Sequence, residues 1–170
     1  AIELNPNYSG AYNNRGSTKK DLANVYKNIN YLEEAIKDFN KAIELNPNYS
    51  KAYYNRGNTK KDLANAYNNI DYLEEAIKDY NKAIELNPNN SEAYFNRYIS
   101  KSLLLAKIVV KNSEEYKKAF DDAYNDLDTA YNLANEQLKE TIKNQVISMA
   151  KSGNEVAIKF CDDKGWEIKI

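Results

Sequence analysis

The chain has 170 residues, enough for one compact domain or one short array of repeats around a continuous core. Its 24 basic and 25 acidic residues nearly cancel, and they are spread along the sequence. This balance disfavours nucleic acids and anionic membrane surfaces as partners, because both attract proteins with an excess of positive charge. No apolar run approaches the roughly 20 residues of a transmembrane helix, and no signal peptide is visible. The single cysteine, Cys161, fits a reducing compartment, so we expect a cytoplasmic protein.

A seven-residue string occurs three times at a fixed spacing. Ala-Ile-Glu-Leu-Asn-Pro-Asn stands at 1–7, 42–48 and 83–89, so the period is 41 residues. Residues 9–49 and 50–90 differ at only eight of 41 aligned positions. A period of roughly 20–50 residues is typical of stacked units, each too small to bury its own hydrophobic face.

Each of these units is predicted to form two antiparallel helices. In the second unit Ser50 is a candidate N-cap, and apolar or small residues then recur at three- and four-residue steps. After a turn-favouring segment, Asp71 followed by Glu74 has the form of a capping box for the second helix. Pro88 limits that helix, because the residue before a proline is pushed out of the α region. The first unit repeats the pattern.

The two units resemble the tetratricopeptide repeat (TPR) family. The family's second-helix spacing is present twice, in Ala35, Phe39, Ala42 and Pro47 and in Ala76, Tyr80, Ala83 and Pro88. The first helices carry the large aromatic and the small residue of the family, at Tyr12 and Gly16 and at Tyr53 and Gly57. The resemblance implies an all-α solenoid of antiparallel helix pairs, wound as a right-handed superhelix, that binds proteins or peptides.

The unit is longer than that of the family, which has about 34 residues. The extra residues lie between Gly57 and Ala76 and correspond to about two helical turns. The simplest interpretation adds about one turn to the end of the first helix and one to the start of the second, so the helices stay paired. The alternative is a single helix that continues through 68–71, with units exchanged between chains.

A third, degenerate unit follows. Tyr94 aligns with Tyr53, and Ala123 begins another copy of the second-helix spacing. Apolar residues continue from Ile99 to Val110, so we expect the first helix of this unit to be longer than the others and buried on more than one side.

Two capping helices are predicted to close the array, over residues 136–151 and 155–164. Between them, Gly153 is expected to terminate the first helix in the left-handed conformation and Asn154 to cap the second. Trp166 is expected to pack back onto Phe160 or Cys161 beyond the last helix.

The predicted organisation therefore has five parts, and the last is a cap that shields the end of the solenoid. We expect a remnant of a preceding repeat, in a fragment of a longer array, followed by two TPR-like repeats, a degenerate third repeat, and the capping pair with a tail. These parts span residues 1–8, 9–49, 50–90, 91–135 and 136–170.

Enzyme chemistry finds no support in the sequence. Histidine, the commonest general base and metal ligand, is absent. The five glycines never follow the spacing of a phosphate-binding loop. Adjacent carboxylates such as Glu74 and Glu75 diverge by about 100° on a helix, which is typical of a solvated face. We expect no catalytic residue, no metal and no cofactor.

The candidate binding site follows from the family resemblance. Inner-surface ligands of TPR proteins contact fixed positions on the first helix of each unit. In this sequence those positions hold Gly10, Asn13, Asn14, Ser17 and Lys20, then Lys51, Tyr54, Asn55, Asn58 and Lys61, then Glu92, Phe95, Asn96 and Ile99. Three of the eight differences between the near-identical units fall at these positions. Such differences are expected if the face binds a ligand of irregular shape, and also if exposed positions simply diverge in sequence.

This concave face combines amides, aromatic rings and lysines, which suits an extended or helical peptide with some acidic character. We therefore expect a protein–protein interaction scaffold with a protein or peptide partner. The alternative is a structural module that associates with itself, as a homo-oligomer or as part of a longer repeat array, and has no peptide in the groove.

Three arginines recur with the period of the repeat. We expect them to form structural ion pairs across each helix pair, because each has an aspartate at a matching position of the second helix and a guanidinium pairs bidentately with a carboxylate. The expected pairs are Arg15 with Asp38, Arg56 with Asp79, and Arg97 with Asp126. The alternative is that these arginines reach a carboxylate of the ligand.

Overall fold

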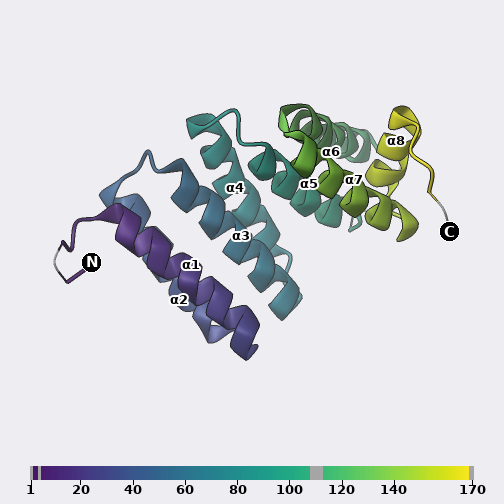
Figure 1. Ribbon diagram of the computed structural model, residues 1–170. Helices are drawn as coiled ribbons and strands as arrows, with labels where there is room; N and C mark the ends of the chain where they lie inside the picture. Colours follow the sequence, from purple (N-terminus) through teal and green to yellow (C-terminus); the bar gives the residue numbers. More distant parts are fainter. Residues whose placement is uncertain (1, 4, 108–112, 169–170) are drawn as a thin grey trace. The chain divides into compact units, whose positions relative to one another are not determined.

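The computed structural model describes residues 2–3, 5–107 and 113–168, and over these residues the fold is built of α-helices (Figure 1). They are α1 (Ser9–Tyr26), α2 (Asn30–Leu45), α3 (Ser50–Tyr67), α4 (Asp71–Leu86), α5 (Ser91–Leu105), α6 (Glu114–Leu133), α7 (Glu136–Lys151) and α8 (Glu155–Lys164). The chain divides into two compact units, Ala1–Pro88 and Asn89–Ile170. The all-α architecture of helix pairs is therefore as predicted. No helix in the described residues is long and apolar enough to span a bilayer.

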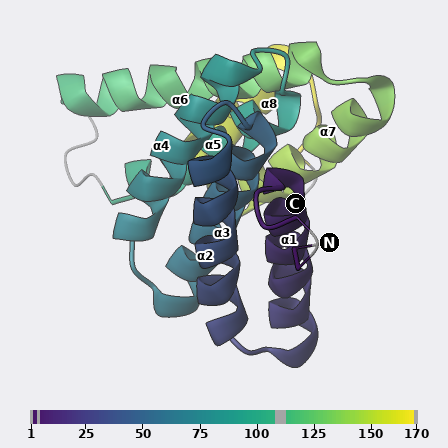
Figure 2. The ribbon, with the colours of Figure 1, turned by 90° about the vertical axis from the view of Figure 1, so that its left-hand side faces the viewer.

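The first unit contains two helix pairs, α1 with α2 and α3 with α4, and α2 also packs against α3 (Figures 1 and 2). A glycine on the first helix of each pair faces an aromatic ring of the second. A Cβ atom on Gly16 would lie 2.8 Å from the Phe39 ring, and one on Gly57 would lie 2.8 Å from the Tyr80 ring. Both rings are fully buried, so the two glycines allow the helices of each pair to approach closely.

The extra length of the repeat is divided between the two helices of each pair. In the second pair α3 ends at Tyr67 and α4 begins at Asp71, with Asn68 between them in the left-handed conformation at φ 49°. Lys27 takes the same conformation at φ 48° between α1 and α2. The alternative of one helix continuing through 68–71 is therefore wrong. The added turns bury a small apolar cluster of their own, formed by Ala23, Leu32 and Leu63.

The helix starts differ from the predicted caps. Ser50 is the first residue of α3, and its hydroxyl donates to the carbonyl oxygen of Ala83 at 2.9 Å, at the end of the paired helix. Asp71 likewise lies inside α4, and its backbone N–H donates to the side-chain oxygen of Asn69 at 2.9 Å. The Ser50 hydroxyl thus satisfies a carbonyl at the end of the paired helix, and the Asn69 side chain satisfies an N–H at the start of the helix after its turn. The local sequence spacing does not reveal either contact.

The second unit contains two further pairs, α5 with α6 and α7 with α8, and α8 also contacts α6. Its core is larger and includes side chains from all four helices, among them Tyr98, Leu127, Ile142, Val146 and Phe160. The expectation of a long first helix is wrong, because α5 ends at Leu105 while α6 is the longest helix of the described residues, at 20 residues. Leu103 is exposed, so the apolar run does not stay on one buried face, and Val110 lies outside the described residues.

The two C-terminal helices have the predicted bounds and terminators. Gly153 and Gly165 both adopt positive φ, at 84° and 66°, and the Asn154 side chain accepts the backbone N–H of Ala157 at 2.9 Å. The Trp166 ring packs edge-on against Phe160, with ring centroids 5.6 Å apart. Its backbone N–H donates to the carbonyl oxygen of Cys161 at 2.9 Å, as a helix terminator of this kind requires.

Candidate protein-binding surface

In the first unit, the first helices of the two pairs lie side by side (Figures 1 and 2). Their shared surface, which we call the α1–α3 face, carries most of the predicted ligand-contacting residues. These are Asn13, Asn14, Ser17 and Lys20 on α1, and Lys51, Tyr54, Asn55, Asn58 and Lys61 on α3. The remaining three, Phe95, Asn96 and Ile99, lie on α5 in the second unit.

A buried amide contact joins α1 to α3 at the base of this face. The side-chain nitrogen of Asn55 donates to the side-chain oxygen of Asn13 at 2.9 Å and lies 3.3 Å from the Ser17 hydroxyl. Asn13 is only 1% exposed, so its side chain is not accessible to a partner. We infer that this pair sets the spacing of the two helices, and that Asn13 does not offer its amide to a peptide backbone as the resemblance implied.

The lysines of the face differ in their surroundings. Lys20 pairs with Asp62 across the two helices at 3.3 Å. Lys61 is half-buried nearby, and its burial lowers the pKa of the ammonium group. Asp62 opposes this shift and the charge of Lys20 adds to it. Lys51 is exposed at the start of α3. Asp62 thus lies near two of these ammonium groups, those of Lys20 and Lys61, and Lys51 adds a third cation at the other end of α3.

Tyr54 supplies the aromatic surface of the face. Its ring is half-buried and packs at a tilt on the Tyr80 ring, with centroids 6.3 Å apart. Tyr80 is itself fully buried, and its hydroxyl donates to the side-chain oxygen of Asn58 at 2.8 Å. Contact with the Tyr80 ring limits the rotamers of Tyr54, so the Tyr54 side chain would lose little entropy when a partner covers it.

The α5 residues are less accessible than the sequence suggested. Phe95 is 7% exposed and packs on Tyr98 within the core of the second unit, with ring centroids 5.8 Å apart. The expectation of an exposed aromatic anchor at this position is therefore wrong. The physical reason is that α5 is covered by the larger core that α6, α7 and α8 complete. Asn96 and Ile99 are half-buried.

The three arginines each lie against the aspartate with which the sequence pairs them. In the second pair, Nε and Nη2 of Arg56 donate to the two oxygens of Asp79 at 2.9 and 2.5 Å. Arg97 meets Asp126 in the same bidentate way, at 2.9 and 2.5 Å. Arg15 likewise donates from Nε and Nη2 to Asp38, with Nε at 2.9 Å.

Sequence reasoning missed a second cation at each of these pairs. Lys19, Lys60 and Lys101 bind the same aspartates, with Nζ at 3.0, 2.9 and 2.8 Å. Burial acts to raise the pKa of Asp38, but hydrogen bonds from its two cations outweigh burial and hold that pKa below its ordinary value. The available signal was the lysine four residues after each arginine, one turn along the same helix face. These arginines are therefore held within the helix pairs by their aspartates.

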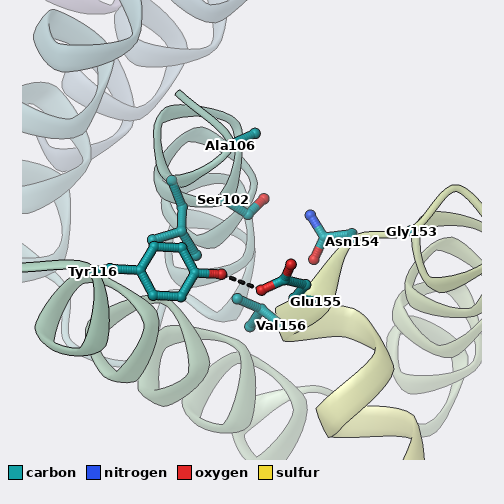
Figure 3. A pocket seen from close by; sticks show the side chains of 8 residues that line it. Ser102, Ala106, Tyr116, Gly153, Asn154, Glu155 and Val156 are labelled. Carbon is teal, nitrogen blue, oxygen red and sulfur yellow. Dashed lines mark hydrogen bonds between the residues drawn. The ribbon is translucent and has the colours of Figure 1, made fainter. Parts of the chain in front are cut away.

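A small pocket of about 150 Å³ lies in the second unit between α5, α6 and the start of α8 (Figure 3). Its polar groups are already paired. The Tyr116 hydroxyl donates to the Glu155 carboxylate, and Asn154 caps α8. Burial and this hydrogen bond raise the pKa of Tyr116 to about 12. The pocket therefore consists of packing and capping groups, and it adds no residue to the binding face.

A family model described as TPR repeat matches the chain over residues 23–63 and 64–97. No curated protein matches the sequence. Among solved structures, the crystal structure of MamA protein is 15% identical, covers 99% of this chain and 82% of its own, and aligns with a TM-score of 0.53. The crystal structure of YrrB, described as a TPR protein with an unusual peptide-binding site, is 20% identical over 95% of this chain and 87% of its own. Its TM-score of 0.30 is too low to support a structural comparison.

Helix pairs that recur at a 41-residue period, with a glycine facing an aromatic ring in both pairs of the first unit, define a helical-repeat protein of the α-solenoid class. Tetratricopeptide repeats occupy residues 23–63 and 64–97 of the chain, as the two matched stretches show. Both stretches begin inside a first helix, so they do not set the boundaries of the structural repeats. Repeats of this kind support the assignment of the chain as a protein-interaction scaffold.

Proposed function

We propose that the α1–α3 face binds a segment of another protein, in extended or helical form, that carries acidic side chains. The observation that carries the proposal is the half-buried Tyr54 ring, held against Tyr80, with Lys51 about one turn before it and Lys61 about two turns after it on the same helix. A rigid aromatic surface surrounded by cations and amides is the kind of site that supplies most of the binding energy in protein interfaces.

Differences between the two near-identical units support the same face. Where Tyr54 stands on α3, α1 has the buried Asn13, and where Asn58 accepts from Tyr80, α1 has Ser17. The exposed part of the face is therefore not a simple repetition, and it presents different chemistry along its length. A partner with one aromatic-binding position and nearby acidic groups fits this arrangement.

The proposal also includes the finer organisation of the chain. We assign repeats from Ser9, Ser50 and Ser91, where the first helices begin, and a C-terminal cap formed by α7 and α8. The only cysteine is free and buried, which fits a cytoplasmic setting.

The experiment begins with a library of displayed peptides selected on the full chain. We expect the selected peptides to be enriched in Asp and Glu. The affinity of one such peptide is then measured by fluorescence anisotropy for wild type, Tyr54→Asn and Tyr67→Ala. Tyr54→Asn installs the residue of the first unit, and Tyr67→Ala removes a tyrosine of the same helix that donates to Glu33 on α2.

Loss of an aromatic anchor costs about 2 kcal/mol, so Tyr54→Asn should weaken binding about 30-fold. Tyr67→Ala should leave the affinity within about a factor of two. Circular dichroism of both variants checks that the fold is retained. Equal affinities for wild type and Tyr54→Asn would contradict the proposed site. If the selection yields no binder and the chain instead self-associates in light scattering, the structural alternative is favoured.

A further inference from the structure

The extra length of the repeat forms a hollow of about 450 Å³ in the first unit, which we call the turn hollow. It lies where the end of α1, the start of α2 and the end of α3 meet, at the lower end of this unit in Figure 1. Its lining residues fall within 23–32 and 62–66, inside the stretches in which the unit exceeds the usual length of the family. Its volume is in the range of ligand-binding sites, which is roughly 300–1,000 Å³.

Apolar side chains form the floor of the turn hollow. Ala23 and Leu32 are buried beneath it, at 7% and 6% exposed, and both belong to the small apolar cluster of the added turns. Ile29, which is half-buried, and Ala66, which is exposed, line its sides. An apolar side chain of a partner that enters the hollow would bury its own surface and that of these residues, which is favourable.

Two asparagines border the hollow with free side-chain amides. Asn24 on α1 and Asn65 on α3 occupy equivalent positions, one period apart, and both are exposed. Across the part of the chain that the structure describes, neither side chain makes a hydrogen bond. In contrast, Asn13 and Asn55 of the same two helices are bonded to each other. Each free amide offers two N–H donors and a carbonyl acceptor.

Free amides on both sides of an apolar floor suit an extended peptide. The backbone N–H and C=O groups of an extended segment are available for hydrogen bonds, whereas those inside a helix are paired within the helix. Side chains of an extended segment alternate between its two faces. One side chain can therefore enter the hollow while those two positions away face the same surface of the protein.

The uncompensated charge at the hollow is positive. Asp62 lines the hollow, but its carboxylate binds the Lys20 ammonium at 3.3 Å. Lys27 follows α1 in the left-handed conformation, lines the hollow and is exposed. Within residues 2–3, 5–107 and 113–168, no acidic group forms an ion pair with Lys27. An acidic side chain of a partner therefore complements the charge at this edge.

We propose that the turn hollow binds an extended segment of a partner protein that carries an apolar side chain with an acidic side chain two positions away. The apolar side chain packs on Ala23 and Leu32. The backbone of the segment pairs with the amides of Asn24 and Asn65, and the carboxylate pairs with Lys27. The inference does not depend on the proposed binding of a partner over Tyr54 on the α1–α3 face.

A short capped peptide tests the hollow by itself. The probe is acetyl-Asp-Ala-Leu-Ala-Asp-amide, which places an acidic residue two positions from the leucine on either side. Two matched peptides replace its leucine by alanine or both of its aspartates by lysine. Tyr54 and Asn65 are eleven residues apart on α3, or about 16 Å, and the extended probe reaches only about 8 Å on either side of its leucine. A probe centred on the hollow therefore does not cover the Tyr54 ring.

Nuclear magnetic resonance titration of the isotope-labelled full chain is the main measurement. The side-chain amide resonances of Asn24 and Asn65 should shift and saturate as the probe is added. The double variant Asn24→Ala and Asn65→Ala should weaken binding about tenfold, because hydrogen bonds to both amides are lost. Lys27→Asn should weaken it about threefold, as expected for an exposed ion pair. Lys37→Gln, at an exposed position of α2 outside the hollow, and Tyr54→Asn should leave the affinity within about a factor of two.

Four results would overturn the inference, provided that circular dichroism shows folded variants. The first is a titration in which the Asn24 and Asn65 side chains do not respond. The second is equal affinity for the probe and either matched peptide, because the apolar or the acidic side chain would then not be recognised. The third is unchanged affinity in the double alanine variant. The fourth is loss of binding in Tyr54→Asn, which would place the probe on the α1–α3 face. Because the probe does not cover Tyr54, this proposal and that of the α1–α3 face can fail separately.

Discussion

Gly57 offers the sharpest test of how the helix pairs are built. A Cβ atom at this position would lie 2.8, 3.0 and 3.2 Å from three atoms of the Tyr80 ring. Favourable carbon–carbon contacts need about 3.5–4.0 Å. Gly57→Ala therefore requires the ring to move by roughly 1 Å, or the two helices to separate. Tyr80 has little freedom to do so, because it is fully buried and hydrogen-bonded to Asn58.

The expected change in the free energy of unfolding is the balance of two opposed effects. Replacing glycine by alanine in a helix interior stabilises by about 1 kcal/mol. Overpacking a well-filled core costs about 1–3 kcal/mol, and displacing the Tyr80 ring also weakens a hydrogen bond that contributes about 1 kcal/mol. We expect Gly57→Ala to lower the free energy of unfolding by about 1–2 kcal/mol. Gly57→Leu should lower it further, because its side chain extends beyond the Cβ atom.

Urea unfolding followed by circular dichroism measures these changes. Asn65→Leu, at an exposed position of the same helix, is the control for the new side chain and should change stability by less than about 0.5 kcal/mol. A double-mutant cycle isolates the contact. Tyr80→Leu destabilises the protein by itself, but in that background the ring is gone and Gly57→Ala should become neutral or stabilising.

If Gly57→Ala stabilises the wild-type chain by about 1 kcal/mol, as an exposed helical glycine would, the close approach of α3 and α4 at this position is refuted. Additive effects of Gly57→Ala and Tyr80→Leu would refute it equally.

Three further predictions concern single residues. Lys27 lies in the left-handed region at φ 48°, so Lys27→Asn, which copies Asn68 of the second unit, should stabilise by about 0.5–1 kcal/mol in urea unfolding, and Asn68→Lys should destabilise. The pKa of Asp38 is below its ordinary value of 3.8 in the folded protein, so its contribution to stability is present above that pH and is lost as the pH falls below it. Asp38→Asn should lower the free energy of unfolding near neutral pH by about 1–3 kcal/mol and reduce its loss in acid, as measured by unfolding at a series of pH values. Cys161 is fully buried and its thiol pKa is raised by burial, so it should react slowly with a chromogenic disulfide until urea unfolds the chain. Rapid reaction of the folded protein would contradict this burial.

The helices of the first unit could be predicted because strong local signals agree with the repeat. Near-identical sequence at a 41-residue period fixes where elements recur, and Pro47 and Pro88 restrict the ends of the second helices. The family resemblance marked Gly16 and Gly57 as small residues, but their contacts with aromatic rings were not predicted. The helix-end contacts were not predicted either, because Ser50 bonds to Ala83 of the paired helix and the Asn69 side chain accepts the first backbone N–H of α4.

The binding face was harder to predict because exposure depends on packing between helices. Phe95 stands at the position equivalent to Asn13 and Tyr54 in the 41-residue period, yet it is buried in a core that needs three further helices. Asn13 was expected to contact a ligand and instead accepts from Asn55 of the next pair. Lys60 was not predicted to join an ion pair, yet its ammonium binds Asp79. In each case the deciding contact lies on another element.

The central claim is that the α1–α3 face is where a partner binds. The most direct measurement is a nuclear magnetic resonance titration of the isotope-labelled full chain with a selected acidic peptide. We expect the largest amide shifts to cluster along α1 and α3, around Asn14, Lys51 and Asn58, and the Tyr54 ring resonances to move. Shifts concentrated on the exposed sides of α2 and α4, or on α7 and α8, would contradict it.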